Sequence, residues 1–230
     1  MVLAGLSLAL LPGTAQALDS ATTDQINRYS AELAAQNALG DQQAGKTLAQ
    51  FLRLSDDEKA RFIALINDPA VMQKFFEAAE EPAAAPATRT VLAGGDVVIK
   101  HEDLGGASDG EPTNDGQEPQ STTPRDMWAS KSVTDTFLGV DVAQVKVRTN
   151  YQVRGRDTTK VYAGSATHYL YVPGCSFSHS PVEEWISSPP ADNAQSETIW
   201  TASCWGSEWD RRERVWGDYR GFVGGYLKKS

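Results

Sequence analysis

Between residues 18 and 81 the apolar side chains recur at spacings of three and four, which is the spacing of one face of an α-helix. Gly40 stands where the first apolar run ends, and glycine commonly follows the last residue of a helix. Three N-terminal capping signals divide the stretch: Thr22 with Gln25, Ser55 with Glu58, and Asp68 before Pro69. The pattern predicts a small N-terminal helical segment of about four short helices.

Residues 82–125 have a different composition, rich in Pro, Gly, Ser, Thr, Asp and Glu. Such a stretch buries too little apolar surface to offset the entropy lost on ordering. Valine, leucine and isoleucine cluster near residues 91–99 and predict one short β segment there. His101, Glu102 and Asp103 follow it, and we expect them in solvent rather than around a metal ion, because three successive side chains of an extended chain do not converge. The composition predicts a low-complexity linker that is largely disordered.

From residue 126 to residue 230 the pattern changes to an alternation of apolar and polar positions, clearest from Val145 to Val153. Turn residues recur every eight to twelve positions, which is typical of antiparallel sheets. We expect about seven strands in a sandwich or barrel. The fold class predicted for the whole chain is therefore a two-part α+β arrangement: a helical segment, a linker and an all-β antiparallel module.

The first residues match a secretory signal. An apolar run from Val2 to Leu11 is too short to span a bilayer, and the small-residue pattern that follows predicts cleavage after Ala17. No second apolar segment of sufficient length follows, so we expect no transmembrane segment. The interpretation is a secreted or extracytoplasmic protein with residues 1–17 as signal peptide.

The two cysteines, Cys175 and Cys204, are expected to pair, because disulfides form in exported proteins. Two cysteines and three histidines are too few for the cysteine-rich or histidine-built metal centres common in proteins. We therefore expect neither a metal ion nor a cofactor.

The charge of the chain disfavours nucleic acid as a partner. Lys and Arg total 21 against 30 Asp and Glu, a formal net charge of −9, and such a chain repels a polyanion. The excess acidity lies before residue 126, because residues 126–230 contain 12 basic and 12 acidic side chains. All six tryptophans lie in this neutral C-terminal module.

Aromatic and basic residues cluster in the second half of that module. Aromatic rings stack on the C–H faces of sugars, while neighbouring polar groups bind hydroxyls. The candidate binding residues are Trp185, Trp205, Trp209, Arg211, Arg212 and Arg214. They predict a binding or cell-envelope module for an extracellular carbohydrate, a cell-wall polymer, or a peptide or protein.

Catalytic signals are weak. The local clusters of ionisable groups are Glu183 and Glu184 near His179 and Ser180, and Asp210 with Glu213. Adjacent side chains of an extended chain point apart, and Pro181 disfavours the helix that would bring His179 and Glu183 together. We expect a protein without enzymatic activity. The alternative is a secreted hydrolase or toxin made as a precursor, with residues 18–81 as a removable pro-region.

Overall fold

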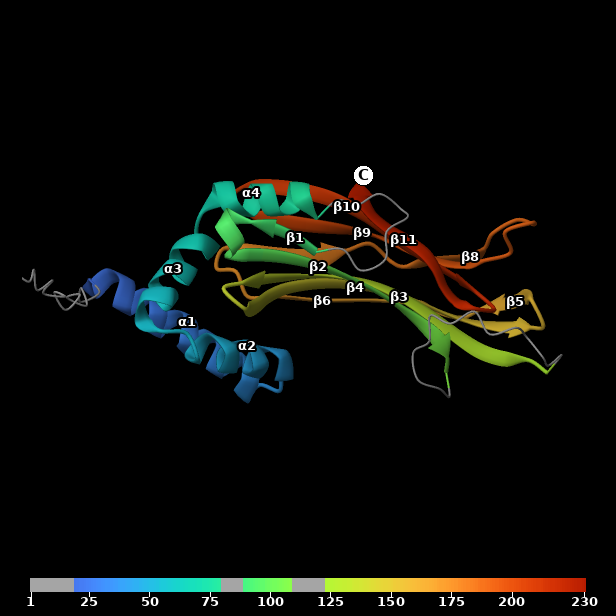
Figure 1. Ribbon diagram of the computed structural model, residues 1–230, viewed down its shortest axis with the longest axis horizontal. Helices are drawn as coiled ribbons and strands as arrows, with labels where there is room; N and C mark the ends of the chain where they lie inside the picture. Colours follow the sequence, from blue (N-terminus) through green and yellow to red (C-terminus); the bar gives the residue numbers. More distant parts are fainter. Residues whose placement is uncertain (1–18, 80–88, 109–122) are drawn as a thin grey trace, which may run out of the picture.

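The computed structural model of the chain describes residues 19–79, 89–108 and 123–230 (Figure 1). The predicted signal peptide with its cleavage point at Ala17 lies outside these residues, as does most of the predicted linker. Export therefore stays a prediction.

The N-terminal part is helical, as its apolar spacing predicts. Its elements are α1 (Ser20–Ala38), α2 (Gln42–Leu52), α3 (Asp56–Ile66) and α4 (Pro69–Ala78). The capping box at Ser55 is confirmed, since the backbone N–H of Ser55 donates to Glu58 and that of Glu58 donates to the Ser55 hydroxyl. None of the helices in the described parts of the chain combines the length and the apolar character needed to cross a membrane.

The capping box predicted at Thr22 is wrong. The N-cap of α1 is Asp19, whose Oδ1 accepts a hydrogen bond from the Thr22 backbone N–H at 2.7 Å. Aspartate caps a helix as well as serine or threonine does, and an earlier start adds residues to the helix.

The C-terminal part consists of antiparallel strands in two sheets, which confirms the predicted antiparallel pairing. Sheet A has the order β1-β2-β3-β4, with β5 and β6 both pairing with β4. Its strands are β1 (Arg89–Leu92), β2 (Val97–Ala107), β3 (Arg125–Phe137), β4 (Val140–Arg154), β5 (Asp157–Val161) and β6 (Ser165–Leu170). Sheet B has the order β11-β10-β9, with β7 and β8 both pairing with β9. Its strands are β7 (Cys175–His179), β8 (Glu183–Ile186), β9 (Ala194–Cys204), β10 (Ser207–Asp218) and β11 (Gly221–Lys229).

The two-part layout is confirmed only in part, because strands from the predicted linker belong to sheet A. β2 pairs with β3 along its whole length, from Val97 opposite Phe137 to Ala107 opposite Met127. The expectation that residues 101–103 lie in solvent is wrong for His101, which is fully buried. It is also wrong for Asp103, whose side chain is 7% exposed. A strand that buries charged residues has the composition of a linker. For this reason the sequence predicted a linker where β2 lies.

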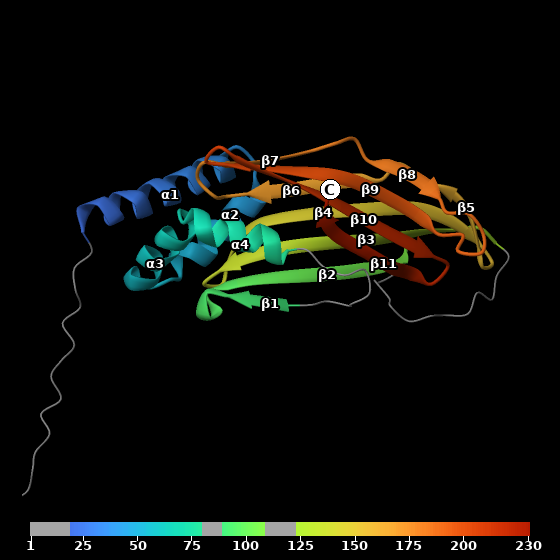
Figure 2. The same cartoon turned by 90° about the horizontal axis from the view of Figure 1, so that it is seen from above.

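The two sheets face each other, α1 to α3 lie at one end of them, and α4 runs alongside the strands (Figures 1 and 2). β10 contacts β3 and β4, and β11 contacts β2 and β3. Figure 2 shows α1 to α3 gathered at the end of the sheets opposite β5 and β8. Hydrogen bonds join the two parts: the Thr47 hydroxyl donates to the Asp141 carbonyl at 2.9 Å, and the Tyr171 hydroxyl donates to Asp41 at 2.9 Å.

An aromatic cluster forms the centre of the helical part. The rings of Tyr29, Phe51 and Phe62 lie 5.0 to 5.2 Å apart. Phe62 also lies 6.4 Å from Phe137 at the end of β3. The helices and the sheets therefore share one apolar contact region.

The predicted disulfide is confirmed. Cys175 and Cys204 are bonded to each other and stand directly opposite in the pairing of β7 with β9. The bond closes a segment with a sequence separation of 29, so the chain-entropy model gives it about 3.5 kcal/mol of stabilisation.

Candidate functional site

The structure divides the six candidate binding residues among three places. Trp185, Arg212 and Arg214 lie on the outer face of sheet B, while Arg211 points inward between the sheets. Trp205 occupies the turn between β9 and β10, and Trp209 lies close to it on β10. Because successive side chains of a strand point to opposite faces, the basic run 211–214 is split by the strand itself.

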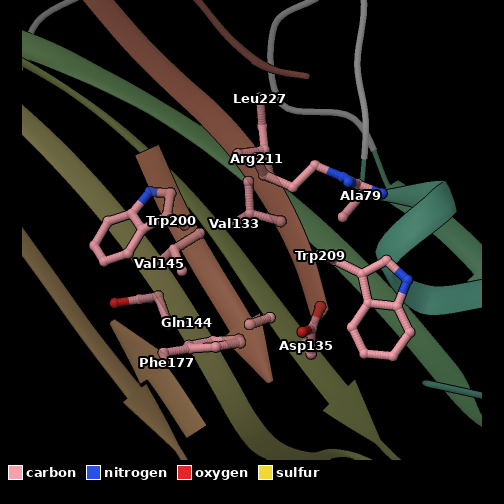
Figure 3. A pocket seen from close by; sticks show the side chains of 11 residues that line it. Ala79, Val133, Asp135, Gln144, Val145, Phe177, Trp200, Trp209, Arg211 and Leu227 are labelled. Atoms are coloured by element: carbon pink, nitrogen blue, oxygen red, sulfur yellow. The ribbon is translucent and has the colours of Figure 1, made fainter. Parts of the chain in front are cut away.

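Arg211 and Trp209 line a small, partly open pocket together with Asp135 and Trp200 (Figure 3). Its volume is about 30 Å³, which holds little more than water and excludes a sugar. Trp205, 41% exposed, lies over Gly174, where an added Cβ would come within 2.7 Å of its Nε1. Trp205 therefore packs near the disulfide, Arg211 and Trp209 line the pocket, and none of the three joins the outer face of sheet B.

The outer face of sheet B carries an aromatic and charged surface that we call the aromatic–arginine face. Alternation on β10 puts Arg212, Arg214 and Trp216 on one side of the sheet. Arg214 is opposite Glu197 on β9 and Tyr226 on β11. The face consists of Trp185, Glu197, Arg212, Arg214, Trp216, Tyr226 and Lys228.

Glu197 holds the two arginines in place. Its Oε1 accepts from Arg212 Nη1 at 3.0 Å, and its Oε2 accepts from Arg214 Nε at 2.5 Å. The Tyr226 hydroxyl donates to the same Oε2 at 3.2 Å. Burial, together with the neighbouring carboxylate of Glu197, raises the pKa of Tyr226 and keeps this hydroxyl protonated. One nearly buried carboxylate thus orients both guanidinium groups.

Aromatic rings flank the arginines. The Arg214 guanidinium carbon lies 4.9 Å from the centre of the Trp185 ring and 5.4 Å from that of Tyr226. Lys228 Nζ lies 4.2 Å from the Tyr226 ring, and the Trp216 ring lies 6.0 Å from it. These cation–π contacts fix a row of planar groups across β8, β10 and β11.

Gly224 makes room for the last ring of this row. A Cβ at Gly224 would lie 2.5 Å from Trp216 Cζ2, a distance that real Cβ atoms do not reach. The absence of a side chain on β11 therefore lets Trp216 lie flat against the sheet.

The clusters considered for catalysis do not converge. Glu184 accepts a hydrogen bond from the Gly164 backbone N–H at 2.8 Å. Asp210 accepts one from the Thr201 hydroxyl at 2.7 Å, whereas Glu213 points to the opposite side of β10 and is fully buried. Within residues 19–79, 89–108 and 123–230, no group of three or more His, Cys, Asp or Glu side chains is placed to hold a metal ion.

Buried ionisable groups lie between the sheets, behind the aromatic–arginine face. Lys131 Nζ lies 3.1 Å from Asp103 Oδ1, with both side chains almost fully buried. Trp200 Nε1 donates to Glu213 Oε2 at 2.6 Å. Burial raises the pKa of Glu213 to about 8, and burial together with the charge of Lys131 lowers the pKa of His101 to about 4. These groups face the interior, so they stabilise or destabilise the fold and do not present themselves to a ligand.

Sequence reasoning missed four members of the aromatic–arginine face: Glu197, Trp216, Tyr226 and Lys228. Alternation could have found Trp216, because it lies two residues beyond Arg214 on the same strand. No sequence signal indicates which strand lies beside β10, so Glu197, Tyr226 and Lys228 could not be assigned to the same face.

No protein-family model matches the chain, and no curated protein or solved structure is similar to it.

Proposed function

We propose that the protein is an exported, non-enzymatic binding protein that holds a carbohydrate on the outer face of sheet B. The observation that carries the proposal is the placement of the Arg214 guanidinium between the rings of Trp185 and Tyr226. Planar groups held side by side on a sheet suit the flat faces of sugar rings. They also lose little conformational entropy on binding, because the neighbouring contacts already order them.

The polar groups of the same face suit carbohydrate hydroxyls and carboxylates. The side chain of Arg212 is 37% exposed and that of Arg214 is 27% exposed, so both guanidinium groups reach solvent. Arginine presents several N–H donors in a rigid plane, which fits vicinal oxygens and carboxylates. A cell-wall polymer or another extracellular polysaccharide offers both kinds of oxygen.

Export is supported by the disulfide, which is typical of oxidising compartments. We assign the facing sheets to the β-sandwich class, in which the outer faces of the sheets remain open to partners. Among the described helices, α2 contacts β4 and α3 contacts β3, and both of these strands belong to sheet A.

Retention of the full chain on insoluble polysaccharides tests the proposal. The panel contains peptidoglycan, chitin, cellulose and a polyuronate gel, so neutral and acidic sugars are both represented. We expect retention on at least one matrix and its loss in the double variant Trp185→Ala, Arg214→Ala. A chain that no matrix retains, or a double variant that is retained as well as the unaltered chain, contradicts the proposal.

A further inference from the structure

Two histidines meet at an open edge between the sheets. β6 of sheet A and β7 of sheet B follow each other in the chain and contact each other. His168 on β6 is opposite Val145, and His179 on β7 is opposite Trp200. Val145 and Trp200 both point into the space between the sheets, and residues paired across strands share a face. Both imidazoles therefore point toward the same gap, from opposite sheets.

The two rings are close enough to share an ion. Their centres are 6.1 Å apart, and both side chains are exposed. Because a metal–imidazole bond is about 2.1 Å long, a shared ion lies about 3 Å from the centre of each ring. Two rings on one ion thus have centres about 6 Å apart or less. Exposed side chains rotate easily, so a small rotation of either imidazole brings the nitrogens to bonding distance.

A neighbouring carbonyl determines which ring nitrogen of His179 carries the proton. Nδ1 lies 2.7 Å from the backbone oxygen of Ser180. A carbonyl oxygen only accepts hydrogen bonds, so Nδ1 carries the proton and Nε2 carries a lone pair in the neutral ring. This arrangement, with one ring nitrogen donating to a backbone carbonyl, is the usual second-shell support of a metal-binding histidine.

We propose that His168 and His179 together bind one divalent transition-metal ion, with water molecules completing its coordination. Two imidazoles favour Cu²⁺ over the other first-row divalent ions, and Zn²⁺ fits the same nitrogen pair. The third histidine of the chain, His101, is fully buried and lies outside this site. The site is separate from the aromatic–arginine face, so the proposal does not depend on carbohydrate binding.

Trp200 provides a built-in reporter. Its ring lies 5.0 Å from the ring of His179 and 5.7 Å from that of His168. A paramagnetic Cu²⁺ ion held by the two histidines therefore quenches the fluorescence of Trp200. Zn²⁺, which has a filled d shell, occupies the same site without quenching.

The test is a Cu²⁺ titration of the full chain, followed by tryptophan fluorescence and by calorimetry. We expect saturable quenching with one ion per chain and recovery of the fluorescence when excess Zn²⁺ displaces the Cu²⁺. His168→Ala and His179→Ala should each weaken this binding by on the order of a hundredfold, because each removes one of two linked ligands.

The matched control is Ser178→Ala, next to His179 on the same strand but opposite Thr201, on the other face of the sheet. It should bind Cu²⁺ like the unaltered chain. Thermal unfolding of all three variants shows whether each one is folded before it is titrated. The proposal is overturned if the unaltered chain shows no saturable quenching, or if folded His168→Ala and His179→Ala chains both bind Cu²⁺ as tightly as it does.

Discussion

Along β10, Arg212 and Arg214 face solvent on the outer side of sheet B, whereas Arg211 and Glu213 face the inside of the molecule. The outer pair contacts one carboxylate and two aromatic rings and keeps part of each guanidinium exposed. The inner face buries Glu213 completely, beside Trp200 and near Lys131 and Asp103. Neighbouring charged residues of one strand therefore have different effects. The outward charges are exposed to solvent, and the inward charges affect the free energy of unfolding.

The largest effect is expected from Lys131→Met. The substitution removes the partner of Asp103 and leaves a carboxylate buried between the sheets. Breaking a buried ion pair from one side costs about 3–5 kcal/mol in the free energy of unfolding. Denaturant-induced unfolding measures this loss.

A matched control comes from the exposed pair of Lys100 and Glu102, whose side chains are 60% and 45% exposed. Lys100→Met should change the free energy of unfolding by less than about 1 kcal/mol, because water already screens that pair. Equal losses in the two variants would show that burial does not distinguish the inner charges from exposed ones.

A smaller effect is expected from Glu213→Gln, and it depends on pH. The pKa of Glu213 is about 8 in the folded chain because of burial, and the ordinary value is 4.5. The folded state thus holds a proton that the unfolded state releases. The stabilisation that Glu213 contributes to the free energy of unfolding is therefore complete below pH 4.5 and is lost as pH rises through 8. Between pH 6.5 and 9 the unaltered chain should lose about 2 kcal/mol more than Glu213→Gln.

Urea unfolding at several pH values checks this difference. The glutamine oxygen can still accept the hydrogen bond from Trp200, so the comparison isolates the titration. His101 has the opposite pH dependence. Because its pKa is lowered, the stabilisation that neutral His101 contributes to the free energy of unfolding is lost as pH falls from 6.5 through about 4. Burial also raises the pKa of Asp135, which titrates in both chains, so the difference between the two pH curves reports Glu213. Parallel pH curves for the two chains would contradict the assignment.

The smallest effect on stability is expected from Arg212→Ala on the outer face. The ion pair of Arg212 with Glu197 is partly exposed, and Arg214 still pairs with the same carboxylate. The free energy of unfolding should change by less than about 1 kcal/mol. Retention on the carbohydrate matrix should nevertheless weaken several-fold. An unchanged affinity would remove Arg212 from the binding surface.

Local signals predicted local structure well. The capping box at Ser55 and the pairing of Cys175 with Cys204 follow from residue type and compartment, and both are confirmed. The alternation beyond Val145 identified antiparallel strands, because burial on one face requires a period of two. The first residue of α1 was harder to predict, because Asp19 and Thr22 are both good N-cap residues and only the fold selects between them.

Long-range features were missed for a physical reason. β2 resembles a linker because its inward positions include His101 and Asp103, and sequence patterns treat charged residues as exposed. The order of the strands depends on contacts between distant segments, so Trp185 could not be placed beside Arg214. The prediction therefore found Trp185, Arg212 and Arg214 but grouped them with Trp205, Trp209 and Arg211, which lie elsewhere.

The most direct test of the central claim compares two tryptophan–arginine pairs on opposite outer faces. Trp185 stacks with Arg214 on sheet B at 4.9 Å, and Trp128 stacks with Arg148 on sheet A at 4.5 Å. The measurement is the affinity of Trp185→Ala and Trp128→Ala for the polysaccharide matrix that retains the unaltered chain. The account predicts a loss of about tenfold for Trp185→Ala, the value of one aromatic stack, and no change for Trp128→Ala. A loss in Trp128→Ala with none in Trp185→Ala would place the binding surface on sheet A and contradict the account.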